Sequence, residues 1–263
     1  MAEKDLTFWN HLDELRKCII HILLAIIAVA MILFIFKDAL FSIVLAPKES
    51  SFITYSIFNQ IATFIGINVL EDFHVDLINT QLANQFLLHV KVTIAASFII
   101  TLPYLLYSLF TFVSPALYKS EKKYTRIVII CGYTLFLLGA LLSYFLIFPL
   151  TFRFLGTYQV SQEISNVINL DSYIDTFFML CTMMGILFEM PIIAWLLAKI
   201  GLINSEFLSQ FRRHAIVAVL IIAAIITPTS DIFTLSIVSL PIYLLYEISI
   251  RITKITHPTK KKD

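Results

Sequence analysis

Long apolar runs dominate this sequence, and they restrict the fold more than any other feature. A helix that crosses a bilayer needs about 20 mainly apolar residues, because roughly 30 Å of hydrocarbon is covered at about 1.5 Å per residue. Six stretches are predicted to do so: 18–36, 90–112, 127–150, 175–198, 213–227 and 232–250. Hydrophobic residues make up 59% of the chain and charged residues 14%, against roughly 45–50% and about 25% in soluble domains. The chain is therefore predicted to be an all-α integral membrane protein with six transmembrane helices.

The last two predicted spans form a hairpin. Between them lies the segment 227–231, Thr-Pro-Thr-Ser-Asp, whose residue types break helices and favour turns. The fifth span is short, because its apolar part, 215–226, would cover only about 18 Å as a helix. We expect either a re-entrant hairpin or a bilayer that is thinner around it.

Basic residues set the expected orientation. Of the 19 Lys and Arg residues, 15 fall in alternate exposed segments: before residue 18, in 119–126, in 199–213 and after residue 250. Cytoplasmic segments of membrane proteins carry such an excess of basic residues, so both termini are predicted to be cytoplasmic. The external segment 37–85 alternates apolar and polar residues, which predicts short amphipathic helices on the membrane surface. The whole chain, 1–263, is predicted to be one transmembrane domain with a cytoplasmic tail, 251–263.

The sequence offers no support for enzymatic chemistry. It contains no G-x-S-x-G or H-E-x-x-H motif and no phosphate-binding glycine pattern. Its three cysteines, Cys18, Cys131 and Cys181, lie at or inside apolar runs and form no metal-binding spacing. We therefore predict no catalytic residues, no cofactor, no metal site and no nucleic-acid partner.

One carboxylate, Glu189, lies inside the predicted fourth span, just before Pro191. A charged group at the centre of a membrane helix costs about 2.5–3.5 kcal/mol, so such residues usually face the protein interior or a wet cavity. Glu189 is thus a functional candidate, although it can instead be protonated and hydrogen-bonded to a neighbouring helix. A proton-coupled transporter that relays protons through Glu189 and Asp231 is one function that this pattern allows.

Several collinear motifs resemble one known family. They are His11 to Arg16, Ala46-Pro47, Phe112 to Lys122, Tyr144 to Pro149, Phe188 to Pro191, Thr227 to Asp231 and Pro241 to Glu247. These motifs are similar to those of TatC, the receptor subunit of the twin-arginine protein translocase of the bacterial inner membrane. The resemblance covers nearly the whole chain, in order, and implies a concave, glove-like bundle with a periplasmic cap.

The resemblance also implies a function and a set of site residues. The matching positions for binding the twin-arginine signal peptides of folded cargo are Glu14, Arg16, Phe112, Pro115 and Glu121. Two acids near the membrane surface suit this task, because a guanidinium pairs bidentately with a carboxylate and the surrounding bases repel other basic peptides.

The remaining matches concern partners. Glu189, Asp231 and Tyr144 are expected to be intramembrane polar positions that contact partners, and Pro47 marks the external loop. The implied partners are TatA, TatB where one exists, other TatC copies and membrane lipid, with export driven by the proton-motive force.

Overall fold

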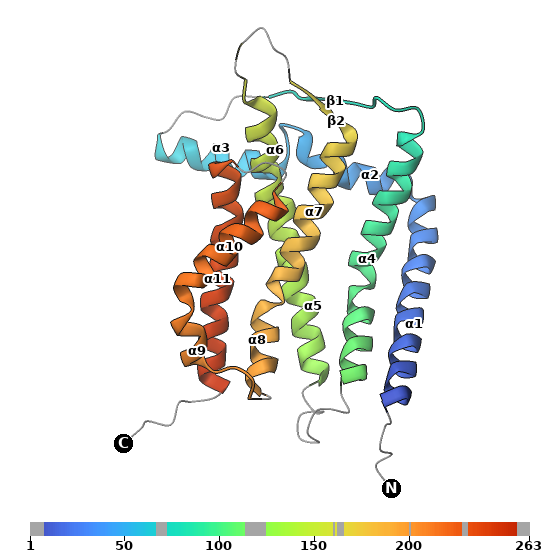
Figure 1. Cartoon of the computed structure of the whole chain (residues 1–263). Coiled ribbons are helices and arrows are strands. Elements are labelled where there is room, and N and C mark those ends of the chain that lie inside the picture. The colour runs from blue at the N-terminus through green and yellow to red at the C-terminus, as the bar shows by residue number, and fades with distance from the viewer. Residues whose placement is uncertain are drawn as a thin grey trace. The chain divides into compact units, whose positions relative to one another are not determined.

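The computed structural model is almost entirely helical (Figure 1). It describes residues 8–66, 73–113, 125–159, 161, 166–199, 201–227 and 231–256. The helices of the first half are α1 (Phe8–Ile35), α2 (Lys37–Leu45), the 3-10 turn η1 (Ala46–Lys48), α3 (Ile53–Ile65), α4 (Asn84–Val113) and α5 (Thr125–Leu142). Those of the second half are the π-helical turn η4 (Ser143–Ile147), α6 (Phe148–Thr157), α7 (Leu170–Phe188), α8 (Met190–Lys199), α9 (Ser205–Gln210), α10 (Arg212–Ile226) and α11 (Ile232–Thr256).

Five helical stretches in the described residues are long and apolar enough to cross a membrane. They are Leu12–Ile35, Asn84–Ser108, Val128–Thr157, Leu170–Lys199 and Ile232–Thr256. The sixth apolar helix, α10, has 15 residues and is about 22 Å long, which leaves it short of the hydrocarbon thickness. The predicted all-α membrane fold is therefore confirmed, with a short helix α10 before α11.

The chain folds as two compact units. The first contains Met1–Leu40 and Phe86–Thr134, and the second contains Phe41–Gln85 and Leu135–Asp263. In the first unit, α1 packs on α4 through Phe34, whose ring stacks on His89 at 4.0 Å and meets the edge of Phe86 at 6.4 Å. The apolar side chains of α1 are otherwise largely exposed, as expected of a helix whose surroundings are lipid.

The second unit is built around an aromatic core. Phe148, Phe152, Tyr173 and Phe177 pack α6 against α7, and three of their contacts are edge-to-face with ring centroids 5.1 Å apart. Such edge-to-face pairs stabilise packing beyond the apolar area that they bury, by about 0.5–1.5 kcal/mol each. This core fixes the position of α7, which continues toward the break at Glu189.

The segment 37–85 contains the short helices α2 and α3, in line with its alternation of apolar and polar residues. Helix α3 ends at Gly66, whose φ of 77° is a left-handed conformation that glycine adopts without strain. The sequence did not predict two short strands, of which the first lies in this segment and the second lies between α6 and α7. Strands β1 (Asp76–Ile78) and β2 (Val167–Asn169) pair in parallel, with Leu77 opposite Ile168.

Candidate functional site

The first candidate site lies near the N-terminal end of α1. Glu14 and Arg16 are both exposed there. In the described part of the chain, no basic side chain forms an ion pair with the Glu14 carboxylate. Arg16 is two residues from Glu14 and does not face it, whereas Lys17 is three residues away on the same helix face but forms no ion pair with it in the described residues. Among the described residues, the Glu14 carboxylate is thus exposed and has no ion-pair partner.

Phe112 lies at the same end of the first unit as Glu14 and Arg16. Phe112 is half-buried in the last turn of α4. The first turns of α1 and the last turns of α4 lie at the same end of this unit (Figure 1). The structure thus brings Glu14, Arg16 and Phe112 to one end of the unit. The two other residues predicted for this site, Pro115 and Glu121, lie outside the described residues.

The second candidate site is Glu189, at the junction between α7 and α8. Its backbone remains nearly helical, because its N–H donates to the Ile186 carbonyl and its own carbonyl accepts from Ile193, both at 3.0 Å. Pro191 has no N–H to donate, which explains why the helix is interrupted here. The Glu189 side chain is half-buried, and its Oε1 is buried without a hydrogen-bond partner among the described residues. This oxygen can accept a hydrogen bond from a partner side chain.

Two glycines set the helix crossing next to Glu189. A Cβ at Gly139 of α5 would lie 2.6 Å from the Met184 carbonyl oxygen and 2.7 Å from Cγ of Phe188. A Cβ at Gly185 of α7 would lie 2.5 Å from Cε2 of Phe136. Each helix therefore places a phenyl ring over a glycine of the other, a close approach typical of membrane helices. Because Phe188 directly precedes Glu189, this reciprocal packing also positions the carboxylate.

Tyrosine hydroxyls bind the loop at residues 43–47, where α2 ends and η1 begins. The Tyr144 hydroxyl donates to the Ile43 carbonyl at 2.9 Å, and that of Tyr173 donates to the Val44 carbonyl at 2.9 Å. The Tyr55 hydroxyl lies 3.1 Å from the carbonyl of Pro47, which is buried. Tyr144 therefore has a partner within the chain, and its predicted role as a contact for another protein stays a prediction.

The Tyr55 hydroxyl also connects this loop to α6. It lies 2.8 Å from the Pro149 carbonyl, so two carbonyl oxygens converge on one phenol. Burial raises the pKa of the Tyr55 phenol well above its ordinary value, and the nearby Arg153 guanidinium offsets only part of that rise. Tyr55 is thus a hydrogen-bond donor over the whole range of pH in which proteins work.

Asp231 caps the last helix. Its Oδ1 accepts a hydrogen bond from the Thr234 backbone N–H at 2.7 Å, and its carbonyl accepts from Leu235 at 3.0 Å. A carboxylate at this position satisfies an otherwise unpaired helix N–H and interacts favourably with the helix dipole. This capping contact explains why an acid stands here without invoking proton transfer.

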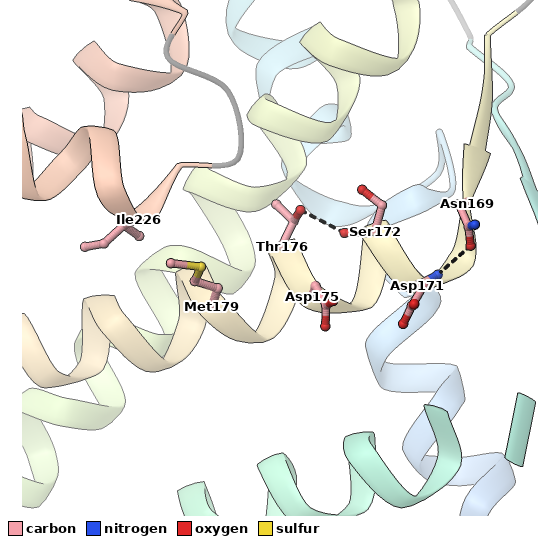
Figure 2. Close-up of a pocket in the computed structure, with 7 residues that line it drawn as sticks. All are labelled: Asn169, Asp171, Ser172, Asp175, Thr176, Met179 and Ile226. Atoms are coloured by element: carbon pink, nitrogen blue, oxygen red, sulfur yellow. Dashed lines mark hydrogen bonds between the residues drawn. The ribbon is translucent and has the colours of Figure 1, made fainter. Parts of the chain in front are cut away.

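An open pocket of about 420 Å³ lies beside the first turns of α7 (Figure 2). Its lining residues are Asn169, Asp171, Ser172, Asp175, Thr176, Met179 and Ile226. The Asn169 side chain accepts from the Asp171 N–H at 3.0 Å and caps α7, and acids in a first turn stabilise a helix dipole. Within the described ranges, no group of three or more His, Cys, Asp or Glu residues could hold a metal ion.

A further ion pair joins α10 to α11 in the second unit. Arg212 contacts Glu247 through two separate bonds, from Nε to Oε1 and from Nη2 to Oε2, each 3.0 Å long. The Tyr243 hydroxyl donates to the same carboxylate at 3.2 Å. This is the fork-to-fork geometry by which a guanidinium recognises a carboxylate.

Sequence reasoning missed Tyr55, Tyr173 and Glu247 as organising residues. Glu247 ends one of the motifs that carry the family resemblance, but nothing local to it indicates Arg212, which lies 35 residues away. The consecutive pair Arg212-Arg213 could have indicated this contact. Two adjacent bases at the start of a helix, in a chain with few charged residues, favour a carboxylate partner nearby.

Comparison with known proteins places these features in a family. The sequence model of "Sec-independent protein translocase protein (TatC)" matches residues 10–241. A protein of that name from Blattabacterium sp. subsp. Periplaneta americana is 34% identical over 265 residues, covering 99% of this chain and 98% of its own length. Another, from Aquifex aeolicus, is 33% identical over 254 residues, covering 96% and 97%.

A solved structure agrees with these sequence matches. The crystal structure described as the twin arginine translocase receptor TatC superposes with a TM-score of 0.74 at 34% identity, over 94% of this chain and 99% of that one. The match of a family model to most of the chain, together with relatives above 30% identity over nearly their full length, decides the assignment. This chain belongs to the TatC family of Sec-independent protein translocase proteins.

Proposed function

We propose that this chain binds the twin-arginine signal peptides of folded proteins at its cytoplasmic face, with Glu14 and Glu121 as the acids that receive the two arginines. As a TatC protein, it is a multi-pass protein of the bacterial inner membrane and a component of the Sec-independent translocase. A related structure bears the description of a twin arginine translocase receptor, which supports the same role here.

The observation that carries the proposal is the open carboxylate of Glu14. It is exposed at the end of α1, whereas Glu247, which also lies near basic residues, is paired with Arg212. Arg16 and Lys17 follow Glu14 on the same helix and are exposed too. An arriving arginine gains a bidentate partner at Glu14, while a generic basic segment meets repulsion from these bases.

The wider activity proposed is recruitment and not covalent chemistry. Signal-peptide binding would be followed by assembly with TatA, TatB where one exists, and further TatC copies, with the proton-motive force as the energy source. Glu189 is the proposed polar contact for a partner helix, because its Oε1 is buried without a hydrogen-bond partner among the described residues. In hydrocarbon, a polar side chain from another helix gains by satisfying such an oxygen.

Crosslinking tests the proposal. Charge reversal by Glu14→Arg or Glu121→Arg is expected to abolish crosslinking to a peptide that carries two consecutive arginines, because the ligand's guanidinium groups then face like charge. Asp13→Arg is the matched control: Asp13 is exposed on the same helix, so the variant changes net charge equally. Undiminished crosslinking in both glutamate variants would refute the proposed role of Glu14 and Glu121.

A further inference from the structure

The chain contains a segment of its own that has the pattern of a signal peptide. Arg212 and Arg213 are consecutive, and the apolar run 215–226 follows them after a single histidine. A basic region followed by about 7–15 apolar residues is the general pattern of export signals. In the structure this segment is α10, and Arg213 is exposed at its start.

The structure also shows how the first of these arginines is held. The Arg212 guanidinium makes two parallel bonds to the Glu247 carboxylate, and the Tyr243 hydroxyl donates to Oε1 of that carboxylate. Tyr243 and Glu247 are one turn apart on α11, so they present a single surface. Glu247 with Tyr243 thus already has the shape and hydrogen bonds that an arginine requires.

This contact is accessible and replaceable. The Arg212 side chain is 48% exposed and that of Glu247 is 25% exposed, so water screens the pair and makes it weak. The neighbouring helix α9 is attached to α11 independently, because the Tyr246 hydroxyl donates to the Leu208 carbonyl at 2.6 Å. Release of Arg212 from Glu247 therefore does not detach the α9–α10 segment from α11.

We propose that Glu247 and Tyr243 form a second guanidinium-binding site, which Arg212 occupies in the free protein and which an arginine of a twin-arginine peptide takes over in a binding event separate from the one at Glu14 and Glu121. The inference rests on the proposed function, because it assumes the same ligand. Arg212 acts as an internal competitor: exchanging one guanidinium for another preserves the bidentate bonds at Glu247, and the exchange favours peptides that carry arginine over peptides that carry lysine.

Carboxyl labelling of the purified protein in detergent tests the site, because mass spectrometry reads Glu247, Glu14 and Glu121 in one experiment. Arg212→Gln is expected to raise the labelling rate of Glu247 about threefold, since a pair this exposed protects the carboxylate only partly. A peptide with two consecutive arginines before an apolar segment should then return Glu247 to its wild-type rate. The same peptide with both arginines replaced by glutamine should leave the rate high.

Two further variants keep the test interpretable. Arg213→Gln is the matched control, because it removes an exposed neighbouring arginine and should leave the labelling of Glu247 at the wild-type rate. Arg212→Lys retains the positive charge without the forked guanidinium, so it should give intermediate labelling of Glu247. It replaces Arg212→Gln in the test if that variant does not fold.

The outcomes separate the two proposals. If the arginine peptide protects Glu14 in Arg212→Gln but leaves Glu247 fully labelled, the second site does not exist and the proposed function stands. If the peptide protects Glu247 but neither Glu14 nor Glu121, the second site stands and the proposed recognition residues are wrong. If Glu247 is labelled equally in the wild type and in Arg212→Gln, Arg212 does not occupy the site and the inference is overturned.

Discussion

Gly139→Ala should destabilise the second unit through the crossing of α5 and α7. The new Cβ would lie 2.6 Å from the Met184 carbonyl oxygen and 2.7 Å from Cγ of Phe188. Favourable contacts between nonbonded carbons lie at about 3.5–4.0 Å, so the added methyl overlaps its neighbours by about 1 Å. Met184 contributes a backbone atom, which cannot rotate away, and the helices must separate.

The size of the effect follows from two opposing terms. Overpacking of a well-packed interior costs about 1–3 kcal/mol, whereas alanine is better than glycine inside a helix by about 0.5–1 kcal/mol. Gly139→Ala is therefore expected to lower the free energy of unfolding by about 1–2 kcal/mol. The corresponding fall in the unfolding midpoint is roughly 2–8 °C, at about 2–4 °C per kcal/mol for a large domain.

Thermal unfolding in detergent, followed by size-exclusion chromatography of the heated samples, measures this shift. Leu138→Ala is the matched control on α5, because Leu138 is exposed on the outside of the unit and its truncation should leave the midpoint nearly unchanged. Adding Phe188→Leu should not rescue Gly139→Ala, since the carbonyl clash with Met184 remains. A Gly139→Ala protein with the wild-type midpoint would refute the reasoning about this crossing.

Three other changes test separate parts of the structure. Glu189→Gln should retain export of a reporter protein and Glu189→Leu should impair it, because the buried position of Oε1 needs a polar group and not a charge. Equal loss of export in both variants would favour proton relay instead. Asp231→Ala should lower the free energy of unfolding by about 1 kcal/mol because the helix cap is lost, whereas Asp231→Asn should retain most of the stability. Identical thermal unfolding midpoints for the two variants would argue against capping. Tyr173→Phe should cost about 1–2 kcal/mol, because it leaves the buried Val44 carbonyl without its donor, and an unchanged unfolding midpoint would contradict that role.

The spans could be predicted because hydrophobicity and helix length are local properties of the sequence. The segment 232–250 lies within α11, and Pro191 accounts for the break at Glu189 that separates α7 from α8. The short apolar run 215–226 forms most of α10, which has the limited length that the turn residues after it imply. In each case a run of apolar residues or a proline acts on its own stretch of backbone.

Long-range contacts could not be predicted in the same way. Tyr173 donates to a carbonyl 129 residues away, and no local pattern distinguishes it from other tyrosines of the chain. The reciprocal packing of Gly139 and Gly185 depends on how two helices cross, which one sequence does not determine. The paired strands β1 and β2 have three residues each, too few for a recognisable alternation.

The residues of the candidate site came from the family resemblance, whereas the contacts around them come from the structure. Glu14 was assigned through the family resemblance, and its role in binding stays a prediction; the structure shows that its side chain is exposed. The pairing of Glu247 with Arg212, by contrast, depends on the packing of α10 against α11. Among the described residues, Glu247 is paired with a base and Glu14 is not.

A charge-swap titration tests the central claim most directly. Hydrogen bonds to charged groups contribute about 1.5–3 kcal/mol, so replacing Glu14 and Glu121 by arginine should weaken binding of a twin-arginine peptide by at least about tenfold per site. A peptide in which both arginines are replaced by glutamate should bind the doubly substituted protein and not the wild type. Fluorescence anisotropy of labelled peptides in detergent measures all four combinations. Restored binding in the swapped pair is the predicted result, and wild-type affinity of the twin-arginine peptide for the doubly substituted protein would contradict the account.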